Sequence, residues 1–125
     1  MNDRVDLAEV PLSAVRRVGE LVFVSGQVPI DTKTGLTVEG SLTAQLSQVM
    51  ANLEGVVLSV GADMADVVKT TVYMTDIRDL AEMNAAYRTH FAPGSYPART
   101  TVQVSALAKS EWLIEIEAVV NVGQN

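Results

Sequence analysis

The sequence has no cysteine and a single histidine, His90, and these two facts remove most metal and thiol chemistry from consideration. Without cysteine there is no disulfide framework, no thiol nucleophile and no zinc knuckle. A Ser-His-Asp triad would have to use His90, whose place near the end of a predicted helix favours a structural role beside the helix dipole. The carboxylates match no calcium-binding loop, and no glycine-rich phosphate loop is present. We therefore expect a protein without a metal ion or other cofactor.

Basic residues are also scarce, because nine lysines and arginines against fifteen aspartates and glutamates give a net charge of −6 and a pI near 4.6. The longest basic cluster is Arg16-Arg17, so the chain lacks the positive surface that binds a nucleic-acid backbone. No apolar run approaches the ~20 residues that cross a bilayer, and the first residues do not form a signal peptide. We expect a soluble, cytoplasmic protein that binds neither nucleic acid nor membrane.

The 125 residues, 48% of them hydrophobic, fit a single domain over residues 1–125. Gly19-Glu20 separates two apolar runs and predicts a β-hairpin with a type II′ turn. Its second arm, Leu21 to Val24, is apolar on both faces, which is typical of a central strand covered on both sides. Residues 1–11 permit a weak edge strand, and residues 28–37 are rich in turn formers and are predicted to be a loop.

Apolar residues at steps of three and four predict two helices. Ser41 is a good N-cap for the first, which runs to Val60, and Asp76 is expected to cap the second, from Ile77 to Phe91. Further strands are predicted at Val67 to Met74, Thr100 to Val104 and Trp112 to Val122. The order β-β-β-α-β-α-β-β indicates an α+β fold with a mixed six-stranded sheet and two helices on one face. Oligomerisation would cover the other face of the sheet.

Candidate chemistry lies in the last third of the chain. Pro97 favours extended geometry at Tyr96, so Arg99 is expected at the start of a strand. A guanidinium on rigid backbone can hold a carboxylate through two parallel hydrogen bonds, although a simple ion pair is the alternative. Glu115 and Glu117 share one face of the final strand, roughly 7 Å apart, where they could also be ordinary surface charges. We hypothesise that Arg99 and one of these glutamates form a site.

Six stretches, read together, are similar to the RidA family of reactive-intermediate deaminases, also called the YjgF or L-PSP family. Each motif is weak alone, but all six follow the family's order over about residues 12 to 120. They are Val18 to Gln27, Gln45 to Leu53, Asp66 to Tyr73, Met83 to Tyr87, Pro97 to Thr101 and Ile114 to Ala118.

This resemblance implies a chorismate-mutase-like subunit assembled as a homotrimer, with three pockets between subunits. It also implies cofactor-free hydrolysis of enamine and imine acids, such as 2-aminoacrylate and 2-iminopropionate, to a 2-keto acid and ammonia. By this resemblance the chain is a 2-iminobutanoate/2-iminopropanoate deaminase-like hydrolase in which Arg99 holds the substrate carboxylate and Glu115 is associated with the attacking water. Further positions that the resemblance places in the pocket are Ser25, Gly26, Asn84 and Thr101.

The sequence departs from the family pattern at two positions, which keeps other functions open. Leu12-Ser13 stands where active members commonly have Tyr-Ser, and Thr101 stands where Cys is frequent. One alternative is a non-enzymatic module that binds a 2-keto acid or another small carboxylate and regulates a partner. A second is a pathway-specific deaminase, for example of the aminomuconate type. Ribonuclease activity, reported for some relatives, fits poorly with an acidic chain that has one histidine.

Overall fold

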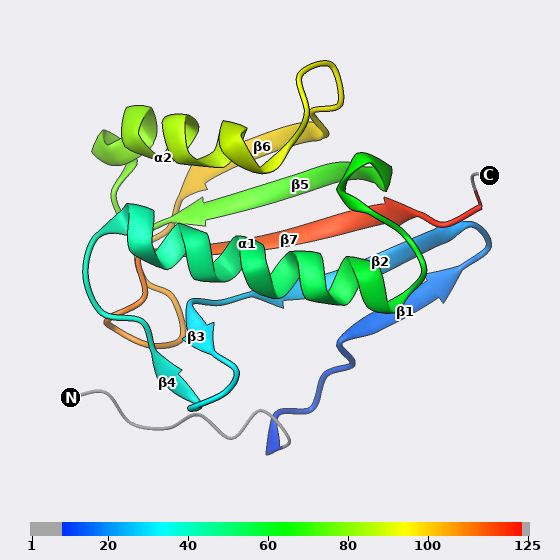
Figure 1. Ribbon diagram of the computed structural model, residues 1–125. Coiled ribbons are helices and arrows are strands. Elements are labelled where there is room, and N and C mark those ends of the chain that lie inside the picture. Colours follow the sequence, from blue (N-terminus) through cyan, green and yellow to red (C-terminus); the bar gives the residue numbers. More distant parts are fainter. Residues whose placement is uncertain (1–8, 124–125) are drawn as a thin grey trace.

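The computed structural model of the protein describes residues 9–123 and shows a five-stranded sheet with two helices against one face (Figure 1). The spatial order is β1-β2-β7-β5-β6, in which β5 and β6 are parallel and the other neighbours antiparallel. The strands are β1 (Val15–Val18), β2 (Leu21–Gln27), β5 (Val67–Met74), β6 (Ala98–Gln103) and β7 (Ile114–Asn121). The predicted α+β fold with a mixed sheet and two helices on one face is confirmed.

Among the described residues the sheet has five strands, and the sixth strand was predicted within residues 1–11. Most of residues 1–11 lie outside the described residues, and the described remainder, Glu9 to Pro11, forms no strand. The prediction that residues 28–37 are a loop is wrong in part, because β3 (Ile30–Asp31) and β4 (Leu36–Thr37) pair there as a separate two-stranded hairpin. Strands of two residues are too short to show the alternation from which a strand is predicted.

The α1 helix (Leu42–Ser59) supplies most of the cover for the sheet. It begins as predicted at Ser41, whose side-chain oxygen accepts a hydrogen bond from the backbone N–H of Ala44 at 3.2 Å. Its apolar stripe, which includes Leu46, Val49 and Leu53, is fully buried against the sheet. Neither α1 nor any other helix within residues 9–123 is long and apolar enough to span a bilayer.

The second predicted helix is shorter than expected. Only α2 (Leu80–Tyr87) is α-helical, and 3₁₀ turns flank it at η3 (Ile77–Asp79) and η4 (Arg88–His90). Asp76 does cap the segment, accepting from the backbone N–H of Arg78 at 3.0 Å. Tighter i→i+3 bonds at both ends satisfy backbone groups that an α-helix leaves free. A third 3₁₀ turn, η2 (Met64–Asp66), leads into β5.

The β1–β2 hairpin closes through the two-residue turn Gly19-Glu20. Gly19 has φ +59°, and no non-glycine residue within 9–123 has a positive φ, which fits the type II′ turn that the sequence predicts.

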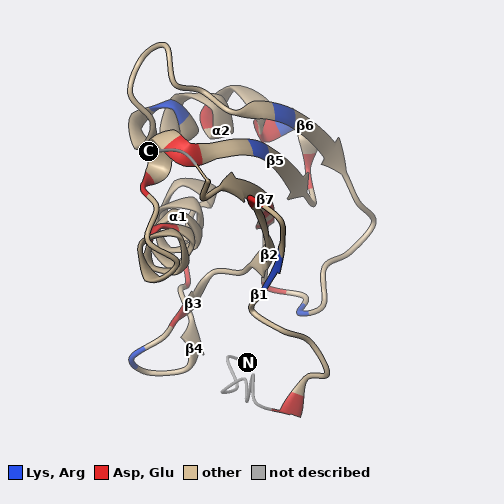
Figure 2. Ribbon diagram, turned by 90° about the vertical axis from the view of Figure 1, so that its right-hand side faces the viewer, with Lys and Arg blue, Asp and Glu red and all other residues tan. Residues whose placement is uncertain are grey.

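One face of the sheet is uncovered at β2. Along this strand, Val22 and Val24 are buried under α1, whereas Leu21 and Phe23 are 37% and 47% exposed. Figure 2 shows both helices on the same side of the sheet. In a single chain β2 is therefore covered on one side only, and the prediction of two-sided cover would need a neighbouring chain.

Candidate functional site

Arg99 lies on β6 and faces the α2 helix. Its Nη2 donates a hydrogen bond to Oδ1 of Asn84 at 2.7 Å, and its Cζ lies 4.9 Å from the centre of the Tyr87 ring. The side chain is half-buried, and no carboxylate of residues 9–123 forms an ion pair with it. An arginine that is oriented by an amide and an aromatic ring, but not neutralised, is suited to binding an external carboxylate.

The Tyr87 ring beneath Arg99 is fixed in turn by the sheet. Its hydroxyl shares a hydrogen bond of 2.7 Å with Oγ1 of Thr70, which is fully buried on β5. Burial raises the pKa of Tyr87, while the Thr70 hydroxyl and the charge of Arg99 oppose that rise. This contact between Tyr87 and Arg99 was not predicted from the sequence. The spacing of Asn84 and Tyr87, one helical turn apart, was the available signal.

A cavity of about 300 Å³ opens beside the guanidinium. Its lining consists of Asn84, Tyr87, Arg88, Tyr96, Pro97 and Arg99. Thr101 lies two residues further along β6, and its Oγ1 is buried without a hydrogen-bond partner among the described residues. Two of the residues predicted for the pocket, Arg99 and Asn84, are therefore in direct contact, and Thr101 follows on the same strand.

Glu115 lies on β7 and packs directly on the backbone of β2. Gly26 makes this approach possible, since a Cβ atom at that position would overlap Oε2 of Glu115 and come within 2.9 Å of its Cδ. The Glu115 side chain is half-buried and accepts no hydrogen bond from the part of the chain that the structure describes. Burial, together with the nearby charge of Glu117, raises the pKa of Glu115. A carboxylate with a raised pKa is better matched to proton transfer near neutral pH.

Glu117 differs from Glu115 although the two share one face of β7. Glu117 is exposed and lies opposite Thr71 on β5, whereas Glu115 lies opposite Tyr73. The pKa of Tyr73 is raised by burial and by its interactions with Glu117 and Glu115. The predicted shared face is therefore confirmed, and of the two carboxylates only Glu115 is partly buried.

A second cavity, of about 500 Å³, contains Glu115 and Gly26 in its lining. Leu12 and Ser25 also line it. The Ser25 hydroxyl donates to the backbone carbonyl of Ser13 at 2.6 Å, which ties β2 to the segment that precedes β1. Three positions that the resemblance assigns to the site, 25, 26 and 115, thus meet in one place, beside Leu12.

Within one chain the Arg99 and Glu115 groups lie on opposite faces of the sheet. Arg99 pairs in register with Thr70, whose side chain reaches Tyr87 on the helix side. Glu115 pairs with Tyr73, and because side chains alternate along a strand, it lies on the uncovered side. A single chain does not bring the predicted carboxylate clamp and the predicted water-activating glutamate together.

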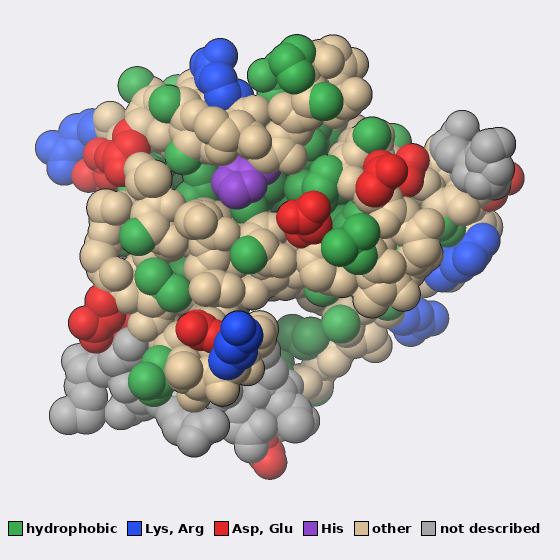
Figure 3. Space-filling view, in the orientation of Figure 1, with side chains coloured by type: hydrophobic (Ala, Val, Ile, Leu, Met, Phe, Trp, Pro, Cys, Tyr) green, Lys and Arg blue, Asp and Glu red, His purple; other side chains and the backbone are tan. Residues whose placement is uncertain are grey.

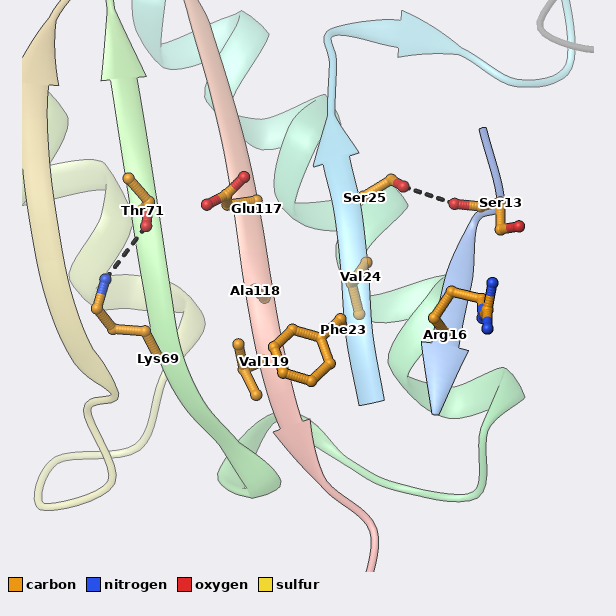
Figure 4. A pocket seen from close by; sticks show the side chains of 10 residues that line it. All are labelled: Ser13, Arg16, Phe23, Val24, Ser25, Lys69, Thr71, Glu117, Ala118 and Val119. Atoms are coloured by element: carbon orange, nitrogen blue, oxygen red, sulfur yellow. Dashed lines mark hydrogen bonds between the residues drawn. The ribbon is translucent and has the colours of Figure 1, made fainter. Parts of the chain in front are cut away.

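The uncovered face carries a further hollow of about 370 Å³. Figure 4 shows Phe23 and Val119 beside one another there, with Glu117, Lys69 and Arg16 around them. The Lys69 ammonium donates to Oγ1 of Thr71 at 3.1 Å. Exposed apolar side chains with charges of both signs make this face suitable for contact with another chain.

The side-chain amide of Gln45 on α1 stabilises the loops around the sheet. Gln45 is buried, and its Nε2 donates to the carbonyls of Val38 and Glu111 while its Oε1 accepts from the backbone N–H of Leu113 at 2.8 Å. The sequence analysis did not assign these contacts. A long polar side chain on the margin of an apolar helical stripe was the only signal for them.

Comparisons with known proteins identify the family of this chain. A family model described as Endoribonuclease L-PSP matches residues 3–122. The chain belongs to this family, which is the RidA or L-PSP family of the sequence analysis. A RutC family protein of Pyrococcus abyssi is 44% identical over 109 residues, covering 87% of this chain and 84% of the relative.

Two further members of the RidA family carry more specific names. A 2-iminobutanoate/2-iminopropanoate deaminase of Salmonella typhimurium is 40% identical and covers 82% of this chain and 80% of its own length. The crystal structure of RidA from an Antarctic Psychrobacter bacterium has a TM-score of 0.86 at 34% identity, covering 95% of this chain and 94% of that one. RidA-family membership is thus supported by sequence and by fold.

Proposed function

We propose that this protein hydrolyses 2-imino acids to 2-keto acids and ammonia. Water adds to the C2 carbon of the imine, the C2–nitrogen bond breaks with proton transfer to nitrogen, and the products are the ketone at C2 and NH₃. The imine carbon is electrophilic, especially when its nitrogen is protonated. The protein therefore needs only to orient the substrate, place a water molecule and stabilise charge.

The unpaired, oriented guanidinium of Arg99 is the observation that carries this proposal. Asn84 and Tyr87 hold it in place, and no carboxylate of residues 9–123 neutralises it. A substrate carboxylate bound in the adjacent cavity would accept two parallel hydrogen bonds and fix the position of the neighbouring C2 atom. Orientation of this kind lowers the entropic barrier to water attack.

Glu115 is the residue that we assign to the water. Its raised pKa and its lack of a described hydrogen-bond donor leave the carboxylate available to accept a proton. General-base catalysis by such a group contributes ~10²–10⁴-fold. Ser25 and Gly26 line the same cavity, where the backbone of Gly26 leaves space for the carboxylate.

We further propose that each site forms between two subunits of a homotrimer. The Arg99 and Glu115 groups lie on opposite faces of one chain and in separate cavities. The uncovered sheet face exposes apolar side chains, including Phe23. In a closed ring of subunits, the Arg99 edge of one chain would meet the Glu115 side of its neighbour.

The direct test couples the protein to a pyridoxal-phosphate serine/threonine dehydratase, which releases the reactive enamine and imine. Keto-acid formation is followed in a buffer that slows spontaneous hydrolysis. We expect faster keto-acid release with the wild-type protein and no acceleration with the folded Arg99→Ala variant. Equal rates with and without the wild-type protein would refute the deaminase function.

A binding module for small carboxylates is the second candidate, and one observation favours it. Leu12, at the position where the family commonly has tyrosine, is 61% exposed and lines the cavity of Glu115. It supplies no hydroxyl to a ligand. Binding of a 2-keto acid without ammonia release from a freshly generated imine would favour this candidate. Nucleic acid is a poor ligand under either function, because the net charge is −6.

A further inference from the structure

The cavity of Glu115 extends well beyond the groups assigned to catalysis. At about 500 Å³ it is much larger than a substrate with a methyl side chain requires, and in Figure 3 the surface is hollowed between α1 and the β3–β4 hairpin. Much of its lining is apolar. Its apolar side chains include Leu12, Ile30, Val56 and Trp112.

Polar side chains that line the cavity beside α1 and the β3–β4 hairpin form hydrogen bonds within the same chain. The Asn52 side-chain amide donates to the carbonyls of Val28 and Ile30 at 3.0 and 2.9 Å. The indole N–H of Trp112 donates to Oγ1 of Thr37 at 3.0 Å. These bonds hold β3 and the Trp112 loop in place around the hollow and leave little hydrogen-bonding capacity for a polar ligand.

Two charged side chains occur in the lining, Glu115 and Lys109. Glu115 is assigned to the water and cannot attract a second carboxylate. Lys109 is half-buried and is the one lining group that could bind the distal carboxylate of a dicarboxylic substrate. A substrate with an apolar side chain would contact the apolar lining, whereas a dicarboxylic substrate would need Lys109. An experiment can distinguish these two substrate classes.

We infer that the site selects 2-imino acids with a large apolar side chain, of the size of leucine or phenylalanine, over the alanine-derived imine. This inference rests on the proposed deaminase function and adds the substrate class. The substrate carboxylate would bind Arg99, the C2 atom would lie near Glu115, and the side chain would enter the hollow beside Val56 and Leu12. One methylene in an apolar pocket changes kcat/KM by about tenfold or more.

The test measures kcat/KM for imines that amino-acid oxidases generate from alanine, leucine, phenylalanine and glutamate. We expect the leucine-derived imine to exceed the alanine-derived imine by at least about tenfold. Val56→Phe, which fills the hollow from α1, should lower the ratio of the leucine value to the alanine value by about tenfold. Leu58→Phe adds the same ring on the exposed side of α1 and should change neither value.

Because Val56 is partly buried, a second variant guards against misfolding. Leu12 is exposed, so Leu12→Phe narrows the hollow without disturbing the core, and it should produce the same selective loss. Circular dichroism verifies that each variant is folded. A preference for the alanine-derived or the glutamate-derived imine would overturn the inference, and so would unchanged selectivity in both folded variants. In these cases the deaminase function itself would stand.

Calorimetric binding of the corresponding 2-keto acids separates this inference from the deaminase function. If no imine is hydrolysed, but 4-methyl-2-oxopentanoate binds more tightly than pyruvate and Val56→Phe removes the difference, the selectivity holds and catalysis fails. Equal affinities for the two keto acids in the wild-type protein would overturn the selectivity.

Discussion

Gly26→Ala isolates the contact between the β2 backbone and Glu115. The new Cβ atom would overlap Oε2 of Glu115, so the carboxylate has to rotate away. Glu115 is a flexible side chain, and its displacement costs about 0.5–1.5 kcal/mol. Gly26 has no positive φ, so alanine also stabilises the protein by about 0.4–1 kcal/mol through the unfolded chain. We expect these two terms nearly to cancel, leaving the free energy of unfolding within about 1 kcal/mol of wild type.

Activity should respond very differently from stability. A catalytic group displaced by about 1 Å costs on the order of 10²-fold in turnover. The assay is kcat/KM for imine hydrolysis, measured beside urea unfolding of the same preparation. Gly55→Ala in α1 is the matched control, because no atom outside the adjacent residues and the local helix backbone lies within 4 Å of the added Cβ. It should gain about 1 kcal/mol of stability and keep wild-type activity. Wild-type turnover in Gly26→Ala would refute the role of this contact.

Three further predictions concern the charged groups and their support. Arg99→Ala should weaken 2-keto-acid binding by at least about 10²-fold, because two charge-assisted hydrogen bonds contribute about 1.5–3 kcal/mol each. Arg99→Lys should recover only part of this affinity. Wild-type affinity in Arg99→Ala would contradict the role of Arg99 as the carboxylate clamp. The charge of Glu117 contributes to the raised pKa of Glu115. Glu117→Gln should therefore lower that pKa and move the acidic limb of the kcat/KM profile to lower pH, and a shift to higher pH would contradict this. Tyr87→Leu removes the ring beside Arg99 and should raise KM by about threefold to tenfold. Tyr87→Phe keeps the ring but leaves the buried Thr70 hydroxyl without its partner, so it should mainly lower stability, by about 1–3 kcal/mol. Equal KM values in the two variants would contradict the ring contact.

The elements with a clear period were predictable from the sequence. The helix from Ser41, the strand Val67–Met74 and the Gly19-Glu20 hairpin all lie where spacing and turn residues place them. Each is determined by local physical chemistry, namely a cap, a run of β-branched residues or a glycine with positive φ.

Two kinds of feature were not predictable, namely elements too short to show a sequence period and contacts between distant segments. The β3–β4 hairpin follows from pairing of two-residue strands, and the 3₁₀ ends of the second helix follow from local bond geometry. The Tyr87 contact with Arg99 depends on how α2 packs on β6. Register, not spacing along one strand, places Arg99 and Glu115 on opposite faces.

The candidate residues themselves came from motif identity, and the structure adds how they are grouped. Asn84 contacts Arg99, while Ser25 and Gly26 gather around Glu115. The sequence alone gives no sign that these residues form two separate groups. Because the two groups lie on opposite faces of one chain, the proposed site requires two neighbouring subunits.

Subunit mixing tests this account most directly. Arg99→Ala and Glu115→Gln subunits, each with impaired activity alone, are co-expressed with different tags, and trimers that carry both tags are isolated. If each site takes Arg99 from one subunit and Glu115 from its neighbour, every trimer that carries both tags has one intact site, so about one third of the sites are intact. The account predicts that imine hydrolysis returns to about that fraction of wild type. Mixed trimers that remain as inactive as the separate variants would contradict a shared site and place both residues' roles within one chain.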